Sequence, residues 1–400
     1  MPAATAGATT RTLAGIACES DSIETVPLAQ EPSFAHWQQD IPVEYAALSP
    51  DELTARIGEA RRTLGTRAIV LGHHYQREDV IEFADYRGDS FKLSQWAAEH
   101  PESEYIVFCG VHFMAEAADI LSAPHQKVIL PNLAAGCSMS DMADPDDVYS
   151  AWAEMEELGI AQDTLPVTYM NSAAALKAFV GEHGGAVCTS SNARKVLAWA
   201  FAQKKRVLFF PDQHLGRNTG YAMGIPEEEM LLWGWARPYG SMGGQTLEGL
   251  ERSRVILWAG HCSVHQRFTP QQIAEVRAKY RDAIVVVHPE CRLETVQAAD
   301  LNGSTEFIAK TVAGAPAGST IAVGTEINLV SRLAKENPDK RVFCLDPVVC
   351  PCSTMYRVHP AYLAWALESL VEGRIENQII VPPEIARGAK LALDRMLAIP

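Results

Sequence analysis

RVFCLDPVVCPC, residues 341–352, ends one of three similar stretches of the chain. The other two are KVILPNLAAGC, residues 127–137, and RVILWAGHC, residues 254–262. Each begins with a basic residue and a short apolar run, which is typical of a buried strand, and each closes on a cysteine. The recurrence of strand and cysteine indicates that one structural unit occurs three times.

The spacing upstream of these stretches supports the repeat. Cys137 stands 64 residues after His73, and Cys352 stands 64 residues after His288. The middle unit is longer, and its excess lies largely in residues 220–244, which we interpret as an inserted loop and helix.

Within each unit, apolar runs alternate with helical patterns, which predicts βαβ units and parallel sheets. The expected fold class is α/β, with three repeated Rossmann-like αβα domains. A helix begins after Ser49, an N-cap residue followed by Pro50. The expected divisions are an N-terminal extension (1–48), three α/β units (49–144, 145–270 and 271–358) and a C-terminal helical segment (359–400).

The amino-acid composition argues against two classes of binding partner. A formal net charge of −15 argues against nucleic acid or an anionic membrane as a partner, because both attract a basic surface. No apolar run approaches the length of a membrane span. The first 20 residues lack the features of a signal peptide, so we expect a cytoplasmic protein whose nine cysteines are mostly reduced.

Three cysteines, Cys137, Cys262 and Cys352, hold matched positions in the repeat. If the units pack around a common axis, their thiols meet at its centre. Three thiolates with one open position suit a catalytic zinc or a [4Fe–4S] cluster. The absence of Asp or His at metal spacing favours the cluster, and the alternative is three buried thiols without a ligand. Six cysteines lack such counterparts. We expect packing or loop roles for Cys344 and Cys350 and core positions for Cys109 and Cys188, while Cys291 follows the HPE turn near the expected pocket and Cys18 lies in the extension.

Polar residues follow the first strand of each unit, where ligands of parallel sheets gather. These residues are His73, Tyr75, Tyr169, Asn171, His288 and Glu290. Hydroxyl residues stand at predicted strand-to-helix turns, namely Ser90, Ser190, Ser304 and Thr305. Such turns hold phosphate or carboxylate, although each of them alone also fits an ordinary N-cap. A carboxylate such as Glu290 at an inward strand end suits a general base.

Together, the motifs resemble those of the quinolinate synthase family between about residues 69 and 358. The motifs are LGHHYQ, RGDSFKLS, CGVHFMAE, LPNLAAGCSMSD, TYMNS, CTSSNA, PDQHLGRN, GHCSVH, VVHPEC, GSTEFI and CSTM. The resemblance implies three α/β domains in a pseudo-threefold arrangement around a central site. It also implies a [4Fe–4S] cluster held by Cys137, Cys262 and Cys352, with an open iron that acts as a Lewis acid.

The implied reaction, a step of NAD biosynthesis, condenses iminoaspartate with dihydroxyacetone phosphate to quinolinate, with release of phosphate and water. An aspartate oxidase or dehydrogenase would supply the imine. Tyr75 and Glu290 would transfer protons. The implied substrate contacts are His73, Ser90, Tyr169, Met170, Asn171, Ser190, His265, His288, Pro289, Ser304 and Thr305.

The sequence departs from the family pattern in two places, and two alternative functions remain open. The last ligand lies in a C-P-C sequence, which leaves Cys350 as a rival to Cys352, and the N-terminal extension has no counterpart that we can place. The other functions are a different hydro-lyase with an open iron, and a non-catalytic protein that binds phosphate or carboxylate.

Overall fold

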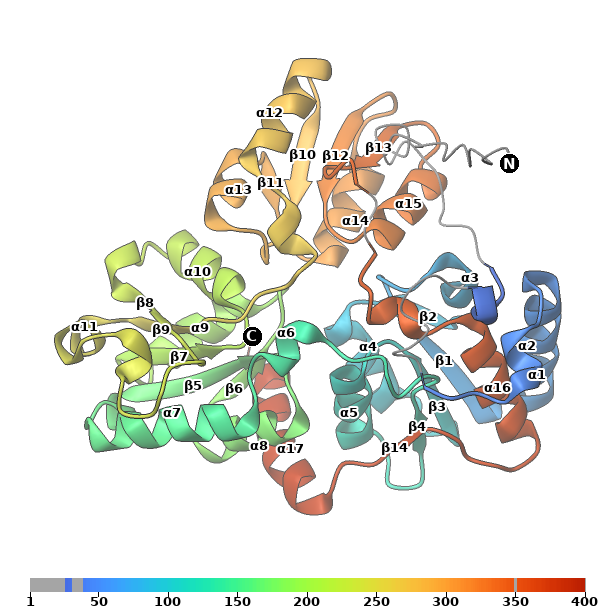
Figure 1. The fold of residues 1–400 in the computed structure, drawn as a ribbon, viewed down its shortest axis with the longest axis horizontal. Coiled ribbons are helices and arrows are strands. Elements are labelled where there is room, and N and C mark those ends of the chain that lie inside the picture. Colours follow the sequence, from blue (N-terminus) through green and yellow to red (C-terminus); the bar gives the residue numbers. More distant parts are fainter. Residues whose placement is uncertain (1–25, 31–38, 349–350, 400) are drawn as a thin grey trace, which may run out of the picture.

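Three separate sheets form the framework of the protein. The computed structural model describes residues 26–30, 39–348 and 351–399. Each sheet with its flanking helices makes one lobe, and the three lobes surround a common centre (Figure 1). The strands of the first lobe are β1 (Ala68–His73), β2 (Tyr86–Gly88), β3 (Tyr105–Cys109), β4 (Lys127–Ile129) and β14 (Gln378–Ile379). Those of the second are β5 (Thr164–Tyr169), β6 (Ala186–Cys188), β7 (Arg206–Phe210), β8 (Met230–Trp233) and β9 (Val255–Trp258). Those of the third are β10 (Ile284–Val287), β11 (Leu301–Asn302), β12 (Thr320–Gly324) and β13 (Arg341–Cys344).

The order of the strands repeats from lobe to lobe. The three sheets run β14-β4-β3-β1-β2, β6-β5-β7-β9-β8 and β11-β10-β12-β13. In each, the first strand pairs in parallel with the next two strands of its unit, and the stretch that precedes the cysteine lies beyond the third. This common order confirms the predicted α/β fold with three repeated units.

Helices cover the sheets. The first lobe carries α2 (Pro50–Leu64), α3 (Glu78–Ile81), α4 (Ser90–Glu99) and α5 (His112–Leu121), with α1 (Val43–Ala46) and α16 (Pro360–Val371) beside α2. The second lobe and the connection leading into it carry α6 (Ser138–Asp141), α7 (Pro145–Glu157), α8 (Ala174–Glu182), α9 (Ala193–Phe201), α10 (Gln213–Ala222), α11 (Leu247–Arg252) and α17 (Pro383–Ala398). The third lobe carries α12 (Pro270–Lys279), α13 (Leu293–Ala298), α14 (Thr305–Gly314) and α15 (Ile327–Glu336). None of the helices in the described residues is long and apolar enough to cross a membrane.

The predicted start of α2 is confirmed. The Ser49 hydroxyl accepts a hydrogen bond from the backbone N–H of Glu52, and the Glu52 carboxylate accepts one from the backbone N–H of Ser49 at 2.8 Å. This reciprocal pair is a capping box, with Pro50 as the first helical residue.

The insertion in the second lobe differs from the prediction of a loop and helix. Residues 220–244 contain β8, which extends the sheet by pairing in parallel with β9, and two short 3₁₀ turns. The run Met230–Trp233 is apolar and four residues long, which suits a strand better than a helix.

The strands are buried along most of their length, and two cores result. One hydrophobic core runs continuously through the first two lobes, while the third lobe has its own. Tyr75, Cys262 and Cys352 pack against both cores. The third lobe is therefore joined to the others mainly through the central region.

The described parts of both terminal segments pack on the first two lobes. The phenol of Tyr45 donates to Glu368 of α16 at 2.6 Å, and α16 packs against α2. β14 pairs antiparallel with β4, and α17 packs against α8 of the second lobe. The expected domain boundaries remain a prediction, although the C-terminal segment contacts two lobes.

We predict that Gly181→Ala destabilises the fold, because α8 and α17 are in close contact there. A Cβ atom at Gly181 would lie 2.0 Å from the backbone oxygen of Gly388. Overpacking of this kind costs about 1–3 kcal/mol, so the midpoint of urea unfolding is expected to fall. Gly58→Ala in α2 is the control, since its nearest neighbour is 3.5 Å away and Ala favours a helix by up to about 1 kcal/mol. An unchanged midpoint for Gly181→Ala would contradict the packing.

Candidate active site and metal centre

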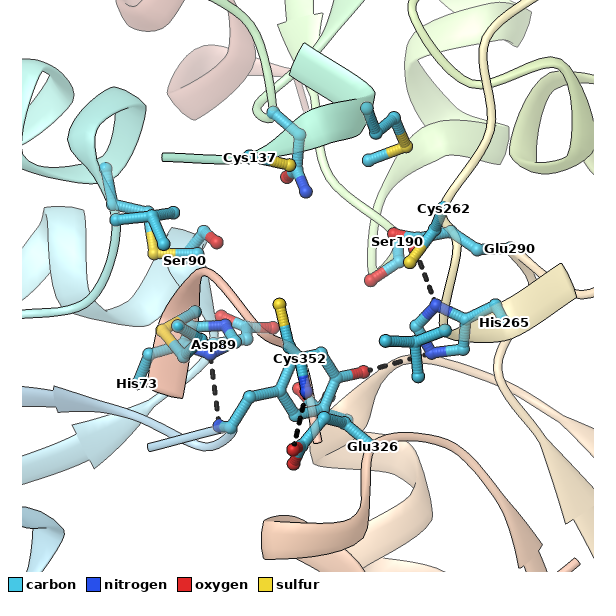
Figure 2. Close-up of a pocket in the computed structure, with 18 of the residues that line it drawn as sticks. His73, Asp89, Ser90, Cys137, Ser190, Cys262, His265, Glu290, Glu326 and Cys352 are labelled. Atoms are coloured by element: carbon cyan, nitrogen blue, oxygen red, sulfur yellow. Dashed lines mark hydrogen bonds and ion pairs between the residues drawn. The ribbon is translucent and has the colours of Figure 1, made fainter. Parts of the chain in front are cut away.

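One cavity lies where the three lobes meet. It is lined by residues from all three, and the unoccupied space, part of it open to solvent, is about 690 Å³ (Figure 2). Thirteen of the sixteen predicted site residues line it, namely His73, Tyr75, Ser90, Cys137, Tyr169, Asn171, Ser190, Cys262, His265, His288, Glu290, Thr305 and Cys352. Met170, Pro289 and Ser304 do not. The carboxyl ends of the strands therefore meet at one place, as expected for parallel sheets.

A three-residue segment at the end of the first strand enters the cavity in every lobe. The segments are His73–Tyr75, Tyr169–Asn171 and His288–Glu290, and the first and third residue of each lines the cavity. The chain turns directly after each strand, and in each of these turns the first and third side chains line the cavity while the middle one does not. Met170 is fully buried in the core, and the carbonyl of Pro289 accepts a hydrogen bond from Asn218.

Hydroxyl groups enter the cavity where helices begin. Ser90 and Thr305 are the first residues of α4 and α14, and each stands 17 residues after the histidine of its lobe, His73 or His288. Ser304 precedes this register and caps α14 by accepting from the backbone N–H of Phe307. Its hydroxyl is occupied within the helix, which explains why Thr305 lines the cavity and Ser304 does not.

The three repeat cysteines come from three lobes and turn their sulfur atoms toward the same space (Figure 2). Each precedes a short helical turn that supplies backbone N–H groups to its sulfur. The donors are Met139 and Ser140 for Cys137, His265 for Cys262, and Thr354 and Met355 for Cys352. Hydrogen bonds of this kind to cysteine sulfur tune iron–sulfur centres.

The electrostatics of the thiols favour a bound cation. Burial raises the pKa of Cys137 to about 12, and burial likewise raises the pKa of Cys262 and of Cys352. Each of the first two thiols is further opposed by the charge of Cys352. Among the described residues that line the cavity there is no Lys or Arg to balance three thiolates. A metal centre would supply the missing positive charge, so the donor set fits a thiolate-bound cluster.

A second donor set shares one of these cysteines. Ligand atoms of Cys262, His265 and Glu290 all lie within 4.8 Å of one another. Thiolate, imidazole and carboxylate together suit a single zinc-like ion. Cys262 belongs to both sets. Cys137 and Cys352 complete the first set, and His265 and Glu290 complete the second.

Glu290 is 4% exposed and carries several contacts. Its Oε1 accepts from the Tyr169 phenol at 2.6 Å, and its Oε2 lies 2.8 Å from Nδ1 of His265, within ion-pair distance. Burial alone would raise the pKa of Glu290, but His265 and His288 outweigh that effect, and the pKa is lowered. The carboxylate is therefore ionised near neutral pH.

Tyr75 joins the same network from the first lobe. Its phenol oxygen lies 2.6 Å from Oγ1 of Thr325, which lies 3.1 Å from Nε2 of His265. Burial and the charge of Glu290 raise the pKa of Tyr75 well above its ordinary value. The phenol keeps its proton, so the site sets a proton donor near an ionised carboxylate.

Sequence reasoning missed several residues of the cavity wall. Glu326 caps α15 and accepts from the backbone N–H of Cys352 at 3.2 Å, and burial raises its pKa to about 7. Asp89 caps α4 and accepts from Ser191 of the second lobe at 3.0 Å. Glu326 comes two residues after the end of β12, so the strand-end rule applied to the third strand of each unit would have found it.

The other cysteines in the described part of the chain do not line this cavity. Cys109 and Cys188 lie on β3 and β6 and are fully buried, as expected for packing residues. Cys291 and Cys344 are also buried. Cys18 and Cys350 lie outside the described residues, so the choice between Cys350 and Cys352 stays a prediction.

Comparisons with known proteins agree with this geometry. The family described as Quinolinate synthetase A protein matches residues 55–398. A quinolinate synthase of Corynebacterium glutamicum is 59% identical over 368 residues, which cover 92% of this chain and 93% of that protein. Quinolinate synthases of Anoxybacillus flavithermus and Herpetosiphon aurantiacus are 52% and 53% identical over 90% and 94% of this chain, and over 96% and 99% of their own length. The chain therefore belongs to the quinolinate synthase family.

Proposed function

We propose that this protein condenses iminoaspartate with dihydroxyacetone phosphate to quinolinate, with release of one phosphate and two waters. The observation that carries the proposal is the convergence of three thiols, one from each lobe, on a cavity that also holds an ionised carboxylate and protonated phenols. Membership in the family supports the same reaction.

The substrates together carry two carboxylates and one phosphate. Ser90 and Thr305 offer hydroxyls and the free N–H groups of helix starts, and Ser190 adds a third hydroxyl from the turn before α9. The Thr305 hydroxyl is buried and has no hydrogen-bond partner among the described residues, so it is free to donate to an anion. These groups suit anionic ends in a cavity with no Lys or Arg among its described lining residues.

The proton transfers fall to Tyr75 and to the pair of His265 and Glu290. Forming the carbon–nitrogen and carbon–carbon bonds and expelling water requires a donor and an acceptor close to the reacting carbons. Tyr75 holds a proton, and Glu290 stabilises the imidazolium that forms when His265 accepts one. Tyr169 fixes the carboxylate from the opposite side at 2.6 Å.

Cys137, Cys262 and Cys352 would hold a [4Fe–4S] cluster, which supplies a Lewis acid when bound. We further propose that an aspartate oxidase or dehydrogenase supplies the imine and that the protein works in the cytoplasm. The seven described cysteines are free thiols, which suits a reducing compartment.

We predict that Cys137→Ser, Cys262→Ser and Cys352→Ser each lose most of their iron, because each removes one of three protein ligands. Cys344→Ser is the matched control, since Cys344 is also buried in the third lobe but does not line the cavity. Cys350→Ser is also expected to keep iron. The measurement is iron and sulfide per chain after anaerobic purification. Full iron in Cys137→Ser with loss in Glu290→Gln would instead support the single-ion set.

We predict that Glu290→Gln and Tyr75→Phe keep iron and lose turnover. Gln is nearly isosteric with Glu but takes up no proton and cannot stabilise an imidazolium at His265. A positioned acid or base contributes about 10² to 10⁴ in rate, so kcat is expected to fall by that order. The measurement is anaerobic quinolinate formation beside iron content. Near wild-type turnover in Glu290→Gln would exclude its role in proton transfer.

A further inference from the structure

Asn218, on α10 of the second lobe, contacts the third-lobe segment that carries Glu290. We propose that Asn218 is a positioning residue, which fixes the backbone on both sides of Glu290 and so sets the place of its carboxylate. The proposal rests on the proposed function only in taking Glu290 as a proton-transfer group. It assigns a role to the end of the PDQHLGRN motif, residues 211–218.

The contact is a double hydrogen bond across the boundary between two lobes. Nδ2 of Asn218 donates to the carbonyl of Pro289 at 2.8 Å and to the carbonyl of Cys291 at 2.7 Å. Glu290 lies between these two carbonyls in the chain. Asn218 is 6% exposed, so both bonds are shielded from water and constrain the segment.

The residue type follows from these two donors. Oδ1 of Asn218 is buried and has no hydrogen-bond partner among the described residues, which is a cost that few buried groups carry. Asp would set an oxygen against two carbonyl oxygens, and Leu would leave both carbonyls without a donor. The Asn218 amide directs its two N–H groups to the two carbonyls, and this orientation leaves its Oδ1 without a donor among the described residues.

The rest of the motif fixes α10 on its own lobe. Asp212 caps the helix by accepting from the backbone N–H groups of His214 and Leu215. Gly216 lets the helix approach the sheet, because a Cβ there would lie 2.5 Å from the Leu257 side chain and 2.7 Å from that of Phe209. Asn218 thus extends from a helix that is anchored in the core of the second lobe.

A parallel contact holds the residue after the segment. Nε2 of His214 lies 2.9 Å from Nε2 of Gln266, and Oε1 of Gln266 accepts from Arg292 at 2.9 Å. Helix α10 therefore contacts residues 289–292 directly through Asn218 and indirectly through His214. Since Tyr169 of the same lobe also donates to the carboxylate, the second lobe fixes both ends of Glu290.

Catalytic groups tolerate little displacement, and a misplacement of about 1 Å can cost about 10²-fold in rate. Asn218→Asp is expected to lower kcat by about 10²-fold. Asn218→Ser, which shortens the side chain and removes both contacts without setting a charge against the carbonyls, is expected to lower it by about 10-fold. Tyr221→Ala is the control on the same helix, because Tyr221 is exposed and should leave kcat unchanged.

Two further readouts separate positioning from general damage. In hydrogen exchange of the protein as purified anaerobically, the peptide that spans residues 288–293 should exchange faster in Asn218→Ser, while residues 213–222 of α10 should be unchanged. In a double-mutant cycle, Asn218→Ser combined with Glu290→Gln should be no slower than Glu290→Gln alone, because Asn218 acts through that carboxylate. Iron content should stay at the wild-type value throughout.

The outcomes are distinct. Unchanged exchange at residues 288–293, or losses that multiply in the double variant, would overturn the proposal. Full turnover in both Asn218 variants beside an inactive Glu290→Gln would do the same. A fully active Glu290→Gln would instead defeat the proposed role of Glu290, and hydrogen exchange would still decide whether Asn218 holds the segment. If Asn218→Asp fails to fold, Asn218→Ser carries the test.

Discussion

Three desolvated thiols meet in a cavity whose described lining includes no lysine or arginine, so they cannot all ionise unless they share a cation, and the proposed metal centre depends on this constraint. Cys137, Cys262 and Cys352 are far apart in the sequence, so no single loop can bring them together. The repeated order of parallel strands brings these cysteines together, because the same end of each of the three sheets faces one centre. Each lobe then adds a cysteine in an equivalent turn, with backbone N–H groups directed to the sulfur.

The second constraint is the charge on Glu290. Removing a carboxylate from water costs several kcal/mol unless it is paired and hydrogen-bonded. His265 and Tyr169 offset that cost, and Tyr169 comes from another lobe. The third lobe has its own hydrophobic core, so polar contacts of this kind add to the packing of Tyr75, Cys262 and Cys352 in aligning it with the other two. The groups proposed to do the chemistry thus also fix the geometry in which they act.

Local signals in the sequence were enough for the repeat, the parallel strands and most of the cavity wall. The matched distance from His73 to Cys137 and from His288 to Cys352 marked equivalent positions without any knowledge of packing. Two features differ from the expectation. Ser304 caps α14 and its neighbour Thr305 lines the cavity, and the apolar run of β8 is too short for its periodicity to distinguish a strand from a helix. Glu326 was missed because it follows the third strand of its unit, whereas the strand-end prediction covered only the first. Asn218 was missed for a different reason, since its role depends on how one element lies against another, which spacing along the chain does not encode.

The equivalent strand-end segments carry a consequence for symmetry. In three identical copies, the position of Glu290 would place three carboxylates around one small cavity, and their mutual repulsion would keep most of them protonated. In a single chain, the same position is free to be a phenol in Tyr75, an amide in Asn171 and a carboxylate in Glu290. Covalent linkage of the copies therefore combines three equivalent cysteines, which suit the proposed cluster, with a cavity wall of unlike side chains, which suits the proposed reaction. A homotrimer of one unit could supply the first but never the second.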